Sequence, residues 1–200
     1  MTQKIVAIIG TYRKDGITDQ TVDAVLGGAR EKGAQTEKIY LTDKHIEFCT
    51  NCRTCCKTDP AQKRGHCVHS DDMDGLLDNL DAADGIVLAS PINFYTVTAV
   101  MKRFVERLTV YSYWPWEQPI PKSRITRMNK KAVIVTSSAC PAFIGRLLMP
   151  NARQILKVSA EVIGAKVAKS VYFGGIATKE KQKLNDRQIK SARDAGLKLL

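Results

Sequence analysis

Short apolar runs alternate along this chain with segments whose apolar residues recur at helical spacing. The first run, Lys4–Ile9, is rich in β-branched residues and is closed by Gly10, which is typical of a buried strand. From about Thr18 the apolar residues step at i, i+3, i+4 and i+7, and Gly33 suits the end of the predicted helix. The chain therefore opens with a strand, a loop and an amphipathic helix.

The same order recurs along the rest of the chain. Further strands are predicted near Thr36–Leu41, Gly85–Ala89, Ala132–Ser137 and Lys166–Phe173, and further helices after Ser70 and at about Thr98–Val110, Asn151–Ile163 and Asn185–Leu200. Ser70 suits the N-cap of the helix that follows it. Such alternation predicts an α/β three-layer sandwich, a parallel sheet with helices on both faces. We expect one domain over residues 1–200, with a cysteine-rich loop insertion at about 43–70.

Composition narrows the class of protein. The 44% hydrophobic and 26% charged residues are typical of a globular protein, and the apolar run Ile5–Ile9 is too short for an export signal or a membrane span. We therefore expect a cytoplasmic protein without a membrane partner. Residues 101–200 carry 20 basic and 6 acidic side chains, but no nucleic-acid reader motif accompanies them. We favour a solvated basic surface that attracts phosphorylated small molecules over a nucleic-acid partner.

Parallel sheets of this type bind ligands at the carboxyl ends of their strands. The loop after the first strand offers Thr11, Arg13, Gly16 and Thr18 at a helix N-terminus, which is a phosphate cradle. It matches neither the GxGxxG nor the GxxxxGK[ST] pattern, so a dinucleotide fingerprint and a nucleotide-hydrolysing loop are disfavoured. The alternative interpretation is an ordinary capped turn.

Two further loops end at the same edge. Ser90–Tyr95 contains Pro91, which stiffens the turn, and two aromatic rings that either shield a flat heterocycle or only fill the core. Thr136–Cys140 offers small polar groups beside the same crevice.

Cysteines are concentrated in the stretch before the second predicted helix, the one that follows Ser70. Five of the six lie there, and the first three follow the Cys-x2-Cys-x2-Cys spacing typical of iron–sulfur sites: Cys49, Cys52, Cys55, Cys56 and Cys67. Zinc sites more often pair two distant Cys-x2-Cys motifs. His66 and His69 flank Cys67 as ligands, as proton donors or as solvated loop residues. An iron–sulfur cluster, a zinc ion and thiols without a metal all remain open.

Four large aromatic residues follow the predicted helix at Thr98–Val110: Tyr111, Tyr113, Trp114 and Trp116. Such a patch suits either a quinone or nicotinamide ring or a subunit interface, and we favour the interface.

The three loops and the cysteine run together resemble the flavodoxin-like NAD(P)H-dependent FMN reductase superfamily, near its iron–sulfur flavoprotein branch. The resemblance covers nearly the whole chain. It is carried by GTYRKDGIT, by ADGIVLASPINFYTVTAVMKRFVERL, and by the cysteine run leading to Asp71-Asp72-Met73. It implies a flavodoxin-like five-stranded parallel sheet of order 2-1-3-4-5 and a homodimer or homotetramer.

The resemblance also implies which residues hold cofactors. The phosphate of FMN would lie on Thr11, Arg13 and Thr18, in a loop whose Gly16 and Ile17 also count as cofactor-binding residues. The ring would lie against Pro91, Ile92, Asn93, Phe94, Ser137, Ser138 and Ala139. A 4Fe-4S cluster would be held by Cys49, Cys52, Cys55 and Cys67. Because a flavin supplies the hydride and electron chemistry, we expect no catalytic side chain.

Three functions follow in order of preference. The first is an FMN-dependent oxidoreductase that passes electrons from NAD(P)H to a small acceptor such as a quinone or free flavin. The second is an iron–sulfur flavoprotein electron carrier with FMN and a 4Fe-4S cluster, fed by ferredoxin. The third, a nucleic-acid-binding regulator with a zinc loop, is weakest because no reader helix accompanies the basic charge.

Overall fold

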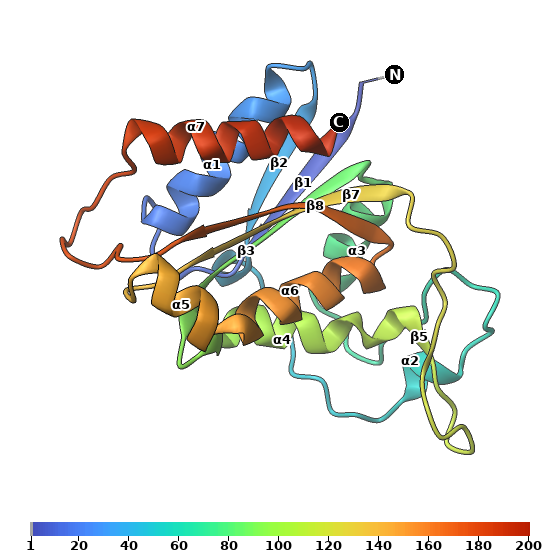
Figure 1. Ribbon diagram of the computed structural model, residues 1–200. Helices are drawn as coiled ribbons and strands as arrows, with labels where there is room; N and C mark the ends of the chain where they lie inside the picture. Colours follow the sequence, from blue (N-terminus) through green and yellow to red (C-terminus); the bar gives the residue numbers. More distant parts are fainter. Residues whose placement is uncertain (1) are drawn as a thin grey trace.

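The central sheet has five parallel strands in the order β2-β1-β3-β7-β8. A computed structural model describes residues 2–200 (Figure 1). The strands are β1 (Lys4–Ile9), β2 (Gln35–Tyr40), β3 (Gly85–Asn93), β7 (Lys130–Ser137) and β8 (Ala165–Phe173). Counted as the five principal strands along the chain, this is the predicted order 2-1-3-4-5, so the flavodoxin-like fold is confirmed.

Helices cover both faces of the sheet, as Figure 1 shows. One face packs against α1 (Ile17–Arg30), α7 (Asp186–Gly196) and η3 (Leu197–Leu199), and the other against α3 (Met73–Ala82), α4 (Ala99–Arg107) and α6 (Pro150–Val162). Alternate residues of β1 point into the two cores, Ile5 and Ala7 into one and Val6 and Ile8 into the other. Burial on both faces explains why the strand reads as a continuous apolar run.

The structure adds elements that the hydrophobic pattern did not predict. They are the short helices η1 (Leu41–Asp43), α2 (Thr54–Lys57) and η2 (Leu108–Tyr111), the paired strands β5 (Ser112–Tyr113) and β6 (Lys122–Ser123), strand β4 (Thr96–Val97) and helix α5 (Ala142–Leu148). Strand β3 also continues four residues beyond its predicted end, because β4 turns back and pairs with it. These elements are too short for a periodic signal.

Two predicted helix ends need correction. Asp72, not Ser70, is the N-cap of α3, and the carboxylate of Asp71 accepts the amide of Met73 at 3.0 Å. Helix α1 ends at Arg30, and Gly33 lies beyond it in a turn with φ of 84°. A positive φ favours glycine, so Gly33 does have a local role.

The aromatic segment after α4 is also different from the expectation. Tyr111 is fully buried within the chain, and its hydroxyl donates to Asp81 at 3.0 Å. Trp114 is partly buried, whereas Trp116 is 58% exposed. The segment is therefore largely satisfied inside one subunit, which removes the argument that it must be buried between two.

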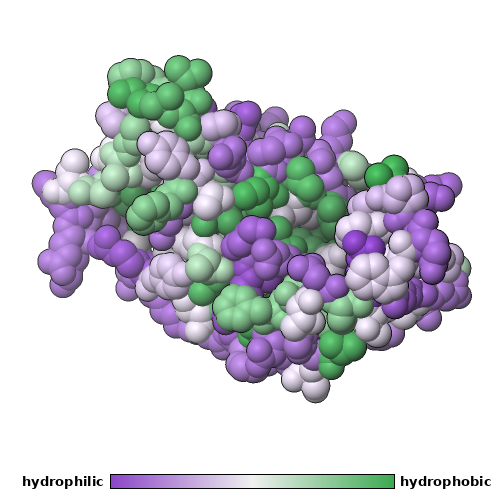
Figure 2. All heavy atoms as spheres, turned by 90° about the horizontal axis from the view of Figure 1, so that it is seen from below, coloured by the Kyte–Doolittle hydropathy of each residue, from purple (hydrophilic) through white to green (hydrophobic). Residues whose placement is uncertain are grey.

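The surface is mixed. Figure 2 views the molecule from below, on the side of α4, and shows apolar side chains in separate groups among polar ones. Exposed large apolar residues include Phe94, Phe143, Leu147 and Leu148. Within residues 2–200, none of the helices has the length and apolar character needed to cross a membrane.

Candidate functional site

The three predicted loops meet at the carboxyl edge of the sheet. The hydroxyls of Thr18 and Ser137 lie 2.7 Å apart, which joins the first loop to the third. Thr98 Oγ1 donates to the carbonyl of Gly10 at 2.5 Å, and Thr98 N donates to Ser90 Oγ at 3.1 Å, which joins the first loop to the second. One hydrogen-bonded frame therefore holds residues that lie more than a hundred positions apart in the sequence.

The first loop leads into α1 without a side-chain cap. Gly16 is the N-cap residue and offers no side chain to accept the first-turn amides. Thr11 and Thr18 are both buried, with 5% and 3% of their surface exposed. Uncapped amides at the N-terminus of a 14-residue helix favour an anion. The loop thus has the donors that a phosphate group requires.

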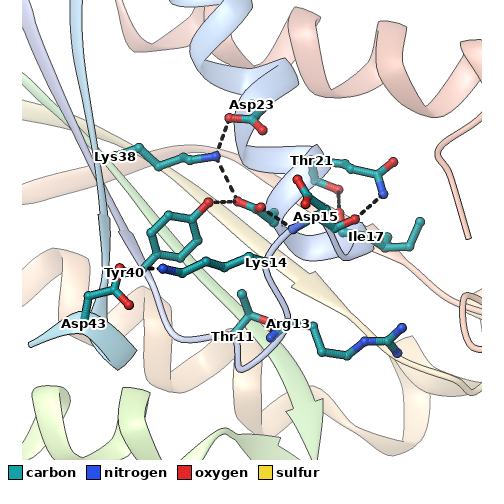
Figure 3. A network of polar contacts seen from close by, with 12 residues as sticks. Thr11, Arg13, Lys14, Asp15, Ile17, Thr21, Asp23, Lys38, Tyr40 and Asp43 are labelled. Carbon is teal, nitrogen blue, oxygen red and sulfur yellow. Dashed lines mark hydrogen bonds and ion pairs between the residues drawn. The ribbon is translucent and has the colours of Figure 1, made fainter. Parts of the chain in front are cut away.

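A buried carboxylate holds this loop on the side that faces Lys38 and Tyr40 of β2 (Figure 3). Asp19 is 1% exposed and accepts the amide of Asp15 at 2.7 Å, Lys38 Nζ at 3.0 Å and the hydroxyl of Tyr40 at 2.8 Å. Burial opposes the charge of Lys38, but the bonds to Asp23, Tyr40 and Asp19 outweigh it and raise the pKa of Lys38. This network holds Asp15 at its positive φ of 61° and so sets the path of the loop.

The two cations of the first loop lie in different surroundings. Lys14 pairs with Asp43 at 2.7 Å, so its charge is neutralised locally. Arg13 is exposed and donates from Nη2 to the carbonyl of Glu180, in the segment between β8 and α7. A guanidinium has five N–H donors, so most of those of Arg13 stay free for a ligand.

The second loop is a tight hairpin with strained backbone. Phe94 and Tyr95 join β3 to β4 with φ of 44° and 64°, which is unusual for residues other than glycine. Phe94 is 98% exposed. Pro91 pairs with Ser137 of β7, but pairing of β3 with β1 ends at Ala89, so the missing proline N–H falls past the end of that ladder. Strain of this kind is concentrated at functional sites.

The third loop is held by β8. Ser138 donates from its backbone to the carbonyl of Phe173 at 3.0 Å, and its hydroxyl lies 2.7 Å from that of Tyr172. Ala139 beside it is exposed. The sequence prediction did not include Tyr172 or Glu180, because both lie after β7, where no motif marks them.

The second predicted site is a pocket lined by sulfur. It gathers Cys49, Cys52, Cys55 and Cys67, while Cys56 lies outside it and bonds to Thr109. The remaining walls are Thr50, Asn51, Arg53, Val68, His69, Arg107, Thr109, Val110 and Trp114. In the part of the chain that the structure describes, no three Cys, His, Asp or Glu side chains converge as they would on a single ion. The thiols instead surround a space.

The buried side chain of Arg124 holds the long insert between Cys55 and Cys67 against the pocket. Arg124 is 9% exposed and donates to the carbonyls of Cys55, Thr58 and Asp59. Gly65 packs so closely against the Cys55 carbonyl that a side chain there would collide with it. The insert therefore folds against the protein, and this brings Cys67 back to the other cysteines.

The thiols differ in acidity. Hydrogen bonds from Thr54 lower the pKa of the exposed Cys52, which precedes α2. A hydrogen bond from the Cys55 thiol lowers the pKa of Cys56 to about 6. A hydrogen bond with Thr109 and the positive charges of Arg124 and Arg53 act in the same direction. The contact with Cys56, 3.8 Å between sulfurs, raises the pKa of Cys55. Arg53 lies 3.5 Å from the centre of the Trp114 ring, so a cation also stands at the pocket wall.

Comparison with known proteins identifies the family of this chain. The model of a family described as NADPH-dependent FMN reductase matches residues 3–174. An iron–sulfur flavoprotein of Archaeoglobus fulgidus is 38% identical over 112 residues, 56% of this chain and 48% of that protein. An iron–sulfur flavoprotein of Methanocaldococcus jannaschii is 36% identical over 104 residues, 52% of this chain and 51% of that protein. The chain spans about half the length of these curated relatives.

Solved structures show the same fold. An NAD(P)H:quinone oxidoreductase from Methanothermobacter marburgensis superimposes with a TM-score of 0.73, at 16% identity, over 100% of this chain and 96% of that chain. At this identity the likeness extends to the fold alone.

Proposed function

Because the chain belongs to the NADPH-dependent FMN reductase family, we propose that it is an oxidoreductase that binds FMN and accepts electrons from NADPH or NADH. It passes these electrons to a small acceptor such as a quinone or free flavin. The observation that carries the proposal is the hydrogen-bonded frame of three loops at the carboxyl edge of the sheet, where flavodoxin-like folds bind FMN.

The residues at this edge fit FMN. The phosphate would be held by the hydroxyls of Thr11 and Thr18 and by the guanidinium of Arg13. The uncapped backbone amides at the start of α1, next to Gly16 and Ile17, would add further donors. Pro91, Ile92, Asn93 and Phe94, with Ser137, Ser138 and Ala139, would line the ring. When bound, FMN supplies hydride and electron transfer.

In this proposed reaction the protein positions the cofactor and shields it from water. The Thr18–Ser137 contact fixes the distance between the phosphate loop and the ring loop. The strained Phe94–Tyr95 turn presents aromatic surface that excludes water from a flat ring. We assign no acid–base role to a side chain of this chain.

Titration of the apoprotein with FMN, followed by flavin fluorescence, tests this site. Arg13→Ala should weaken FMN binding about 10- to 100-fold, because a charge-assisted hydrogen bond contributes about 1.5–3 kcal/mol. Arg30→Ala, at the far end of α1, is the matched control and should bind FMN as the wild type does. Equal affinities of all three proteins would remove Arg13 from the site. Failure of the FMN-loaded wild type to oxidise NADPH or NADH with a quinone or free flavin would refute the reductase function.

We also propose a second function, that of an iron–sulfur flavoprotein electron carrier holding FMN and a 4Fe-4S cluster and fed by ferredoxin. Its specific support is that the four cysteines proposed as ligands line one pocket, while Cys56 does not. Four cysteine thiolates are the usual ligands of such a cluster. Anaerobic reconstitution with iron and sulfide should load the wild type with about four irons per chain, the content of a 4Fe-4S cluster. If no iron is retained, this function fails and the reductase function stands.

We further propose that the chain forms a homodimer or homotetramer. Phe143, Leu147 and Leu148 on α5 are 77%, 78% and 58% exposed, and Phe94 adds a fourth large apolar side chain. Exposed large apolar side chains gathered on one short helix are typical of an association site. Sedimentation equilibrium at micromolar concentration should show an oligomer, and a monomer there would contradict the proposal.

A further inference from the structure

Two residues that line the sulfur-lined pocket each carry a buried side-chain nitrogen without a hydrogen-bond partner. These nitrogens are Arg107 Nε and His69 Nε2. In residues 2–200, Arg103 Nε is the one other buried side-chain nitrogen or oxygen in this condition, and Arg103 does not line the pocket. A buried N–H left without a partner destabilises a fold, because it loses its bonds to water and gains none in return. This cost suggests that a ligand in the pocket accepts from them.

The rest of the Arg107 guanidinium is already used. Arg107 is 1% exposed; Nη1 donates to the Glu47 carbonyl at 2.9 Å and to Asp71 Oδ2 at 2.5 Å, and Nη2 donates to Asp71 Oδ1 at 3.3 Å. These bonds fix the plane of the group. The position of Nε is therefore fixed by contacts that the two Nη atoms make at the other end of the guanidinium.

The residues that line the sulfur-lined pocket indicate which kind of ligand it would bind. Two guanidiniums, of Arg53 and Arg107, and the His69 ring share the wall with four thiols, and no carboxylate lines the pocket. The pocket thus places the Arg53 cation and the N–H groups of Arg107 and His69 around its sulfurs, a lining that suits an anionic sulfur-rich group.

We propose that Arg107 Nε and His69 Nε2 are donors to the sulfur atoms of an iron–sulfur cluster held by Cys49, Cys52, Cys55 and Cys67, and that they raise its reduction potential. This rests on the second proposed function. Hydrogen bonds to cluster sulfurs stabilise the form with one more electron, because that form carries more negative charge. Arg107 and His69 are positioning residues here, since the cysteines hold the iron.

The rival interpretation is that Arg107 only anchors the loop through Asp71 and Glu47. Arg107→Lys separates the two, because lysine keeps the charge and an ion pair with Asp71 but has no Nε–H. Arg103→Lys is the matched control. It lies one turn earlier on α4, also has an unpartnered Nε, and stacks near Phe48 away from the pocket. His69→Phe removes the second donor independently.

The experiment is a dithionite titration of the anaerobically reconstituted full chain, followed by electron paramagnetic resonance of the reduced cluster. Arg107→Lys should lower the reduced-to-oxidised ratio about tenfold at a fixed potential, equivalent to about 59 mV for one electron. His69→Phe should act in the same direction, and Arg103→Lys should match the wild type.

An unchanged potential in Arg107→Lys, with iron content retained, overturns the proposal, as does a wild type that takes up no iron. If Arg107→Lys does not fold or retains no iron, His69→Phe decides the question: a lowered potential supports the proposal and an unchanged one overturns it. FMN-dependent NADPH oxidation by the same samples tests the reductase function separately, because it needs no iron.

Discussion

Asp71 and Arg107 form a buried ion pair on which the cysteine pocket depends. Both side chains are 1% exposed. Asp71 also accepts the amides of Glu47 at 2.7 Å and Met73 at 3.0 Å, so one carboxylate joins the cysteine segment, α3 and α4. Burial opposes ionisation, but the bond from Arg107 and the two amides outweigh it and lower the pKa of Asp71. The negative charge is therefore part of the folded structure.

Asp71→Asn should lower the free energy of unfolding at pH 7 by about 3–5 kcal/mol, because it leaves the Arg107 charge buried without a counter-ion. A lowered pKa contributes stability above the ordinary carboxyl value, about 4, and loses it as pH falls through the folded value. The wild type should thus lose stability below about pH 4, and the variant should lose less over that window. Urea unfolding at pH 7 and between pH 5 and pH 3 measures both.

Asp74→Asn is the control for that change, since Asp74 is exposed in the first turn of α3. It should cost no more than about 1 kcal/mol, from the helix dipole. Equal losses in the two variants would show that the buried pair has no special role.

Sequence patterns located the cysteines but not the arginines around them. Charged residues are usually assigned to the surface, yet Arg107 lies three positions after Phe104, on the buried face of α4. That position was the signal that could have found it. Arg124 gave no such signal, because it follows a short strand with no period of its own. The sequence left the role of His69 open between ligand, proton donor and solvated loop residue, and in the structure its Nε2 is buried.

At the scale of elements, α1 and α7 pack with their backbones in close contact. A Cβ on Gly28 of α1 would collide with the Arg193 carbonyl of α7, and one on Gly196 would collide with the Val25 carbonyl. Glycine is required at both positions because a backbone, which cannot rotate away, occupies the space. This contact brings the segment before α7, with Glu180, alongside the first loop.

Gly28→Ala should destabilise the protein by about 1–3 kcal/mol, since the two helices must separate to admit the methyl group. Gly27→Ala, one position earlier in α1, has open space and should stabilise it by up to about 1 kcal/mol through helix propensity. Thermal unfolding of both variants checks the prediction. A stable Gly28→Ala protein would mean that the helices are not held at this distance.

The strands were predictable and the short elements were not, for a physical reason. Strands buried on both faces must be apolar throughout, so Lys4–Ile9 and Gly85–Ala89 can be recognised as strands from the sequence. Helix α5 has only seven residues, and β4 has two. Their conformations come from tertiary pairing, such as that of β4 with Ile92 and Asn93, which no local pattern encodes.

At the scale of the whole molecule, α4 joins the two candidate sites. Thr98, its N-cap, bonds to Gly10 and Ser90 of the proposed FMN loops, and Arg107, its last residue, lines the sulfur pocket. Nine residues of α-helix span about 13 Å. The sites are thus near enough for one protein to serve both cofactors, yet they share no lining residue.

Binding at the two sites should therefore be independent. Cys52→Ser should abolish iron uptake and leave FMN affinity within twofold of the wild type, whereas Arg13→Ala should weaken FMN binding and leave iron content unchanged, because distant sites without shared partners are additive to about 0.3–0.5 kcal/mol. Cys56→Ser is the control for the thiol, since Cys56 lies outside the pocket. FMN titration and iron analysis of all three variants make the comparison. Loss of FMN in Cys52→Ser would show that α4 couples the sites instead of only separating them.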